Sequence, residues 1–131
     1  MPPLLYLSVL DIEALHVFIM DRTGDPPSPL RDRGLLEAAV MRPRMAAYYE
    51  NADLIQQAAL LAIGISQAQA YIQGNKRTAF IAADVSLRVN GCVLDGDPLE
   101  MARLLEAAAT HHGRGDRARD RLTDWLREHV S

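Results

Sequence analysis

The chain has 131 residues, a formal net charge of -3 and 49% hydrophobic residues, values typical of one globular domain that spans residues 1–131. The negative balance argues against a broad nucleic-acid-binding surface, and the single cysteine, Cys92, excludes an internal disulfide and any multi-cysteine metal site. The sequence contains no window of roughly 18 apolar residues and no signal-peptide pattern, so we expect a cytoplasmic protein without a membrane span.

The N-terminal segment is expected to form an edge strand followed by a helix. LLYLS, residues 4–8, is short and apolar enough for an edge strand. Ser8 and Asp11 have the spacing of a capping box, which predicts a helix that stops near the Pro/Gly-rich loop RTGDPPSP. This helix carries four apolar residues at helical spacing: Leu10, Leu15, Phe18 and Ile19.

A proline divides the next stretch into two predicted short helices. RDRGLLEAAVMRP predicts a helix that ends at Pro43, because proline disfavours the helical conformation of the residue before it. RMAAYYENAD predicts a second short helix, followed by a cap around Asn51 or Asp53.

The middle of the chain predicts two long helices in succession. Residues 54–72 predict a central helix, which is apolar on all sides from Ala58 to Ile65 and should therefore cross the core. Residues 76–89 predict the next helix, ended by Asn90 and Gly91.

The C-terminal part predicts a short strand and two more helices. GCVLDGD is expected to form the strand, which can pair with LLYLS. A helix from Pro98 to about His112 has proline at its first position after Asp97, and RARDRLTDWLREHV closes the chain as an amphipathic helix after the loop HHGRGDR. The whole pattern predicts an all-α fold of about six helices with a small β element.

The stretch YIQGNKRTAF, residues 71–80, interrupts this helical pattern with a candidate anion site. Asn75 is a good N-cap for the helix that follows, whose first backbone N–H groups lack internal partners and favour an anion. Lys76 and Arg77 add two cations, which would be unfavourable there by roughly 0.3–1 kcal/mol each without an anionic ligand. We therefore predict phosphate binding by five consecutive residues: Gly74, Asn75, Lys76, Arg77 and Thr78. The alternative is an ordinary helix–helix turn with a solvated Lys-Arg pair.

QAYIQGNKR, residues 69–77, resembles the core motif of the Fic/Doc (Fido) family, H-[PX]-F-x-[DE]-[GA]-N-[KG]-R, and GNKRT is similar to the Doc branch. IEALHVFIMDRTG, LRDRGLLEAAVMRP, SLRVNGCVL and WLREH resemble Doc-type segments in order and spacing, so the likeness covers nearly the whole chain. The resemblance implies an all-helical fold with a small β element and an active site in the loop between the two central helices.

The resemblance also implies a function. Family members transfer part of a nucleotide, often AMP, to a protein hydroxyl, whereas the Doc branch transfers the terminal phosphate of ATP to a translation elongation factor. Doc proteins are toxins, neutralised by a small antitoxin whose disordered tail folds on them. ATP or another nucleotide is thus the expected ligand, and an antitoxin and a translation factor are the expected partners.

Two catalytic positions of the motif differ in this chain. The family histidine, the base for the target hydroxyl, is replaced by Gln69, so a general-base contribution of about 10²–10⁴-fold is expected to be lost. The metal-holding acid is replaced by Gln73, a weaker Mg²⁺ ligand, which predicts weak or absent Mg²⁺ binding. The phenylalanine is replaced by Tyr71, a mild change. Asn75, Lys76 and Arg77 are retained.

Ser66, Gln69 and Gln73 share one face of the predicted central helix, where they would line the floor of the site. His16 is expected to have a packing role, and His111 and His112 to lie in a solvated loop.

Three readings of the function remain open. The chain is a nucleotide-binding Doc-like toxin with doubtful catalysis, a weak kinase that relies on Lys76 and Arg77, or a non-catalytic interaction protein.

Overall fold

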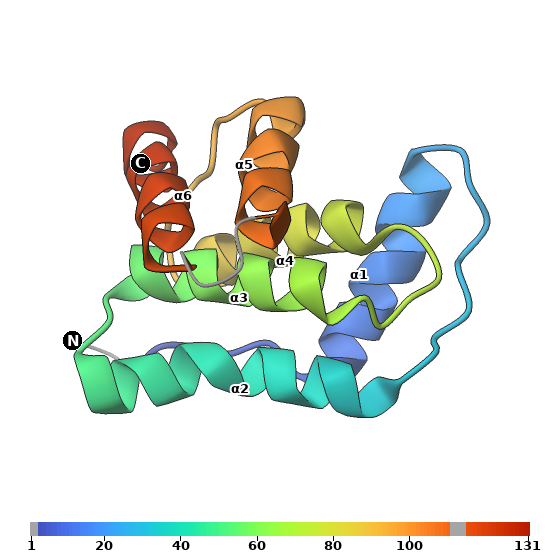
Figure 1. Cartoon of the computed structure of the whole chain (residues 1–131), viewed down its shortest axis with the longest axis horizontal. Coiled ribbons are helices and arrows are strands. Elements are labelled where there is room, and N and C mark those ends of the chain that lie inside the picture. The colour runs from blue at the N-terminus through green and yellow to red at the C-terminus, as the bar shows by residue number, and fades with distance from the viewer. Residues whose placement is uncertain (1–2, 111–114) are drawn as a thin grey trace.

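The computed structural model describes residues 3–110 and 115–131, and within these ranges it is built from helices (Figure 1). The elements in chain order are α1 (Val9–Arg22), α2 (Arg33–Glu50), α3 (Leu54–Ala68), α4 (Asn75–Val89), α5 (Pro98–Thr110) and α6 (Gly115–His129). The all-α class and the helix number expected from the sequence are confirmed.

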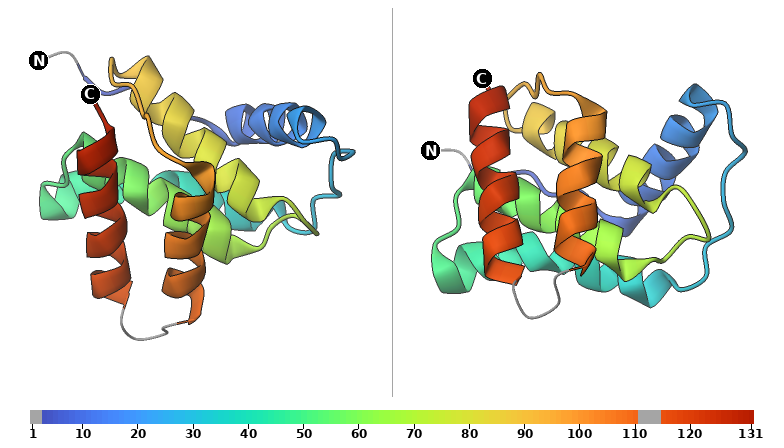
Figure 2. Two further views of the ribbon diagram at one scale, coloured as in Figure 1. Left: turned by 90° about the horizontal axis from the view of Figure 1, so that it is seen from above. Right: turned by 45° about the horizontal axis from the view of Figure 1, so that its top comes forward.

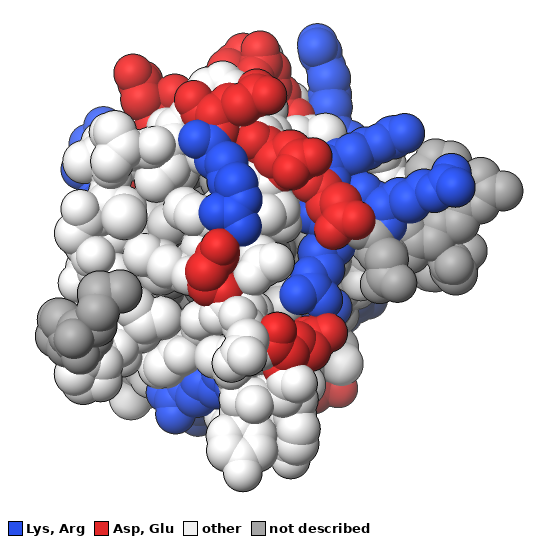
Figure 3. Space-filling model, turned by 90° about the vertical axis from the view of Figure 1, so that its left-hand side faces the viewer, with Lys and Arg blue, Asp and Glu red and all other residues white. Residues whose placement is uncertain are grey.

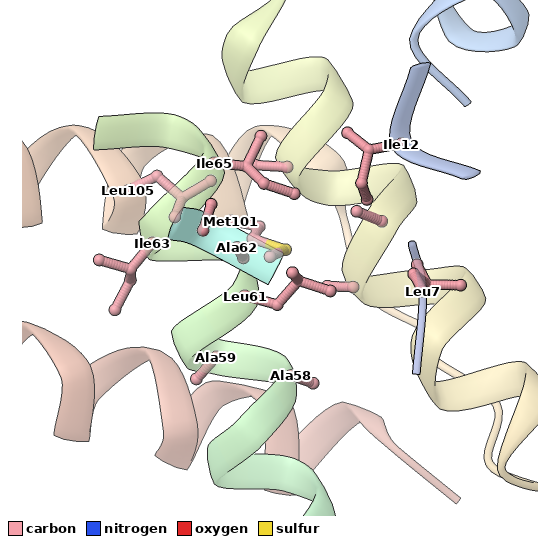
Figure 4. Close-up of a cluster of buried hydrophobic side chains, with 14 of the residues drawn as sticks. Leu7, Ile12, Ala58, Ala59, Leu61, Ala62, Ile63, Ile65, Met101 and Leu105 are labelled. Carbon is pink, nitrogen blue, oxygen red and sulfur yellow. The ribbon is translucent and has the colours of Figure 1, made fainter. Parts of the chain in front are cut away.

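Helix α3 is the centre of the molecule. It packs against α2 on one side, against α4 on another and against the antiparallel pair α5 and α6, while α1 crosses α4 (Figures 1 and 2). Its residues from Ala58 to Ile65 are all buried, as the continuous apolar stretch predicts. Figure 4 shows the side chains of this helix meeting Ile12 of α1 and Met101 and Leu105 of α5.

Helix α1 begins at the predicted capping box. The Asp11 N–H donates to Ser8 Oγ at 3.2 Å, and the Ser8 N–H donates to Asp11 Oδ2 at 2.8 Å. The buried face of this helix differs from the stripe seen in the sequence, since it consists of Ile12, His16 and Met20. Leu10 and Phe18 are largely exposed, because α4 covers only the opposite face of the helix.

Helix α2 corrects the prediction that Pro43 ends a helix. It continues from Arg33 to Glu50 as one element, with Pro43 in its interior. Proline removes the hydrogen bond to the carbonyl of Ala39. Packing outweighs this loss, because Leu36, Ala39, Pro43 and Ala46 form the buried face that contacts α3.

Both caps considered for the α2–α3 connection are present. Asn51 ends α2 in the left-handed conformation with φ of 55°, and the Ala52 N–H donates to the Ala46 carbonyl at 3.2 Å. Asp53 begins α3 with a capping box to Gln56.

The expected β element is reduced to two isolated antiparallel bridges in the described residues, Leu30 with Tyr71 and Leu94 with Val130. GCVLDGD does not pair with LLYLS. Val93 instead exchanges two backbone hydrogen bonds of 2.9 Å with Ser131, and the Asn90 side chain binds the backbone of Leu5. The C-terminal residues take the place of residues 4–8 as the pairing partner, because the end of α6 lies beside residues 93–95.

The surface carries no sign of a large single-charge patch on the face shown in Figure 3, where acidic and basic side chains are interspersed. No helix in the described ranges is long and apolar enough to cross a membrane.

Candidate functional site

The candidate site is the loop of residues 69–74 that joins α3 to α4. Helix α3 ends at Ala68, earlier than the predicted residue 72, and Gln69 adopts the left-handed conformation with φ of 52° and ψ of 39°. The prediction that Ser66, Gln69 and Gln73 form a polar stripe on one face of α3 is therefore wrong. Ser66 lies buried in α3, whereas Gln69 and Gln73 are exposed residues of the loop.

Asn75 shows why the helix cannot continue through this loop. Its Nδ2 donates to the Tyr71 carbonyl at 2.9 Å, and its Oδ1 accepts from the Tyr71 N–H at 3.1 Å. This side chain satisfies the backbone of a residue four positions earlier, so the loop is held open. The prediction that Asn75 is the N-cap is therefore wrong. Asn75 is the first residue of α4, and Gly74 occupies the capping position.

The loop runs antiparallel to residues 28–31, the end of the α1–α2 connection. The Arg31 N–H donates to the Ala70 carbonyl at 2.7 Å, and the Ile72 N–H donates to the Pro29 carbonyl at 3.2 Å. The Gln73 N–H donates to Ser28 Oγ at 2.9 Å. The Arg31 guanidinium also contacts the Gln69 carbonyl. The position of the loop therefore depends on a segment about 40 residues away in the chain.

Gly74 occupies a position between α4 and α1 that has no room for a side chain. Its φ is +84°, and a Cβ atom there would lie 2.5 Å from Met20 Sδ and 3.1 Å from His16 Cε1. The N-terminus of α4 is packed this closely against α1, and Gly74 makes no side-chain cap.

His16 is buried beneath the loop, which confirms its expected packing role. Its ring stacks on Tyr71 with centroids 3.6 Å apart, its Nδ1 lies 2.8 Å from Thr78 Oγ1, and its Nε2 lies 3.0 Å from the Ser28 nitrogen. Burial, together with the nearby Arg77, lowers the pKa of His16 below its usual value. Burial and the nearby Glu13 raise the pKa of Tyr71 to about 12.

The two motif cations already have acidic partners inside the protein. Arg77 Nη1 donates to Asp25 Oδ2 and to Thr23 Oγ1, both at 2.7 Å. Lys76 pairs with Glu106 of α5. These acids come from segments that sequence reasoning could not connect with the motif, because no periodic pattern links residues so far apart.

The first-turn N–H groups of α4 differ in their availability. The Thr78 N–H donates to the Gly74 carbonyl at 2.9 Å, and its hydroxyl donates to the same carbonyl at 2.7 Å. Thr78 is fully buried, so it lies beneath the predicted anion position. Asn75, Lys76 and Arg77 precede it, and among the described residues no side-chain cap is found at this helix end.

The exposed amide of Gln69 is held by two hydrogen bonds in the place of the family histidine. Its Nε2 donates to the Ser66 carbonyl at 2.9 Å, and its Oε1 accepts from Asn75 Nδ2 at 3.4 Å. An amide so placed orients the loop but cannot take a proton near neutral pH.

The residues around the loop do not fit a resident Mg²⁺ ion. Asp25 and Glu106 are engaged by Arg77 and Lys76, and the position of the family acid is the neutral Gln73. Within the part of the chain that the structure describes, no three histidine, cysteine, aspartate or glutamate side chains could hold a metal ion together. His111 and His112 lie outside the described residues.

Comparison with known proteins finds a family model that covers the loop. The model of the Fic/DOC family matches residues 6–87, a range that contains α1, α2, α3, the whole loop and α4 as far as Leu87. The chain is 33% identical to "Protein kinase doc" of Escherichia phage P1 over 106 residues, which cover 80% of this chain and 82% of that protein.

A second relative is more similar over a shorter stretch. The chain is 43% identical over 70 residues to "Toxin Doc" of Mycolicibacterium smegmatis, and the match covers 52% of this chain and 54% of that protein. The match therefore spans only about half the length of this relative.

Proposed function

The chain belongs to the Fic/DOC family, and from that premise we propose that it is a Doc-type toxin of a toxin–antitoxin system that binds a nucleotide at the loop before α4. The observation that carries the proposal is the GNKR segment at the start of α4. There the backbone N–H groups of three successive residues, Asn75, Lys76 and Arg77, have no capping side chain in the part of the chain that the structure describes. Such N–H groups favour phosphate oxygens.

The two internal ion pairs define how a ligand would enter. Arg77 and Lys76 are bound by Asp25 and Glu106 in the structure, and all four side chains are partly exposed. Exposed ion pairs contribute little to stability, so a polyphosphate with several charges can displace these carboxylates at small cost. We expect a nucleotide to compete with Asp25 for Arg77.

Phosphoryl transfer from this site would depend on positioning and charge. The chemistry relies chiefly on orienting the phosphates and stabilising developing charge, which Lys76 and Arg77 can supply. The missing base at Gln69 and the missing acid at Gln73 predict slow transfer to the hydroxyl of a protein target. In the Doc branch that target is a translation elongation factor.

A second candidate is a binding protein without catalysis, and the amide of Gln69 favours it. The amide is fixed by Ser66 and Asn75 rather than pointing freely toward a target hydroxyl. In this reading the fold and its partner surface are kept while the chemistry is lost.

One experiment separates the two candidates. Purified protein is incubated with γ-labelled ATP and a cell extract, beside variants Gln69→His, Gln73→Asp and the double substitution. A Doc-type kinase predicts at least about a hundredfold more labelled target with the double variant, the low end for a general base. A double variant that binds ATP but labels nothing favours the binding protein. A wild type that does not bind ATP contradicts the proposed ligand.

The antitoxin surface that we propose is the exposed apolar stripe of α1. Leu10, Val17 and Phe18 share one helix face and are each at least half exposed. A groove of about 440 Å³, between residues 5–7, α1 and the C-terminal end of α4, adjoins the stripe. An amphipathic helix could lay its apolar face along this surface.

The test is co-purification with a small antitoxin-like protein, if the neighbouring reading frame encodes one. Leu10→Glu with Phe18→Glu should abolish the complex, because a charge is buried at each contact. Leu99→Glu, which changes an equally exposed leucine of α5, is the matched control and should leave the complex intact. Equal binding by both variants would contradict this surface.

A further inference from the structure

The hydrogen bonds of His16 have a fixed direction. The backbone N–H of Ser28 can only donate, so Nε2 accepts it at 3.0 Å and the ring proton lies on Nδ1. That N–H donates to Thr78 Oγ1 at 2.8 Å, and the Thr78 hydroxyl donates onward to the Gly74 carbonyl at 2.7 Å. Every donor in this chain of hydrogen bonds has one acceptor, and the ring is neutral.

This chain of hydrogen bonds joins three separate parts of the fold. His16 belongs to α1, Ser28 to the α1–α2 connection and Thr78 to the first turns of α4. Each partner in turn holds the motif loop, because Ser28 Oγ accepts the Gln73 N–H and Thr78 binds the Gly74 carbonyl. The stack on Tyr71 adds a direct contact between the ring and the loop.

No water molecule can easily replace these contacts. His16 and Thr78 are at most 1% exposed, and Ser28 is 9% exposed. A buried N–H that loses its only acceptor is strongly unfavourable. A charged imidazolium would also place an N–H of Nε2 against the N–H of Ser28, donor against donor. The ionisable groups around the ring are Arg77 of α4, with its partner Asp25, and Tyr71 of the loop, which Glu13 approaches.

We propose that His16 is the positioning residue of the motif loop: its neutral ring ties the α1–α2 connection to the start of α4 and so sets where Gln69, Gln73 and Arg77 stand. The effect on ligand binding rests on the proposed nucleotide site. The hydrogen bonds that link Ser28, His16 and Thr78 do not depend on that site, and they can be measured without a ligand.

The experiment compares a substitution that keeps the ring but loses its hydrogen bonds with one that keeps hydrogen-bonding groups but loses the ring. His16→Phe keeps a ring for the stack on Tyr71 but has no acceptor for Ser28. His16→Gln carries an amide oxygen that can accept the Ser28 N–H. Ile12→Val, on the same buried face of α1, is the control for loss of packing alone.

The first readout is amide hydrogen exchange at Ser28 and Gln73, and the second is the dissociation constant for ATP. We expect exchange about tenfold or more faster and ATP binding about tenfold or more weaker in His16→Phe, comparable to the loss of one buried hydrogen bond. His16→Gln should restore both toward wild type, and Ile12→Val should leave both unchanged.

The outcomes separate this inference from the proposed function. Unchanged exchange at Ser28 and Gln73 in His16→Phe would overturn the positioning role. If the wild type does not bind ATP, the nucleotide proposal fails, and the exchange data still decide whether His16 positions the loop. If His16→Phe does not fold, nitrogen NMR of the wild-type ring decides, because a proton on Nε2 would overturn the arrangement.

Discussion

Gly74 and Asn75 act differently although they are neighbours in the motif. Gly74 allows a backbone with φ of +84° pressed against Met20 and His16, where no Cβ atom fits. Asn75 keeps the loop open by binding both backbone groups of Tyr71. One residue supplies the close approach of α4 to α1, and the other prevents α3 from running on into α4.

Gly74→Ala should therefore destabilise the protein. The methyl group would meet Met20 Sδ at 2.5 Å, and alanine is strained at this positive φ. We expect a loss of about 1–3 kcal/mol in the free energy of unfolding. Urea denaturation measures it, with Gly91→Ala as control, since φ there is +88° and no atom lies within 4 Å of the added Cβ. Equal losses in the two variants would show that the packing against Met20 is unimportant.

The lowered pKa of His16 predicts a pH dependence of stability. Its folded-state pKa lies below the unfolded value of about 6.5, so the unfolded chain binds the proton more readily. Stability is complete above pH 6.5 and falls as the pH decreases toward the folded pKa, by at most about 1.4 kcal/mol per pH unit. Denaturation of wild type and His16→Gln between pH 8 and pH 5 isolates this effect. A constant difference between the two proteins over that range would contradict it.

At the scale of the elements, helix ends are fixed by local residues and helix faces are fixed by distant ones. The capping boxes of α1 and α3 need only residues three apart, and both form. Which face of α1 is buried depends on α4, and so the exposed Leu10 and Phe18 look no different in the sequence from the buried Ile12.

Ser8→Ala should weaken the start of α1. It removes the hydroxyl that accepts the Asp11 N–H, and such N-cap losses cost about 0.5–2 kcal/mol. Thermal unfolding should show a lower midpoint for Ser8→Ala, and Ser8→Asp, which keeps an acceptor, should resemble wild type. A midpoint equally lowered in both variants would point to another role for the Ser8 hydroxyl.

The same division explains how much could be predicted. Apart from α2, for which the sequence predicts two short helices, the helices follow from local patterns and are confirmed, as are the central role of α3 and the presence of a loop before α4. The interior position of Pro43 could not be foreseen, because packing of α2 on α3 overrides the local preference. The early end of α3 could not be foreseen either, because it depends on the hydrogen bonds of the Asn75 side chain to the Tyr71 backbone. In the site, the ion pair of Arg77 with Asp25 joins residues 52 positions apart, and the pair of His16 with Thr78 joins residues 62 apart.

At the scale of the whole molecule, the α5–α6 pair completes the core on which the site stands. This pair lies beyond the range matched by the family model, which ends at residue 87. Yet Met101, Leu105, Leu122 and Leu126 belong to the same buried cluster as Ile65 of α3, and Glu106 of α5 contacts Lys76 of the motif. Folding of the C-terminal pair and order in the loop should therefore be coupled.

Leu126→Ala tests whether the chain is one cooperative domain. Leu126 is fully buried in α6, so its truncation should lower the free energy of unfolding by about 2–5 kcal/mol. Trp125, the only tryptophan, reports on α6 through fluorescence, since its Nε1 donates to Glu100 of α5 at 2.9 Å, while far-ultraviolet circular dichroism reports on all the helices. If the fold is one domain, both signals should shift together to lower urea in the variant and remain coincident. Leu99→Ala, an exposed change in α5, should leave both unchanged. Loss of the fluorescence signal at lower urea than the helical signal would show that α5 and α6 unfold separately from α1–α4.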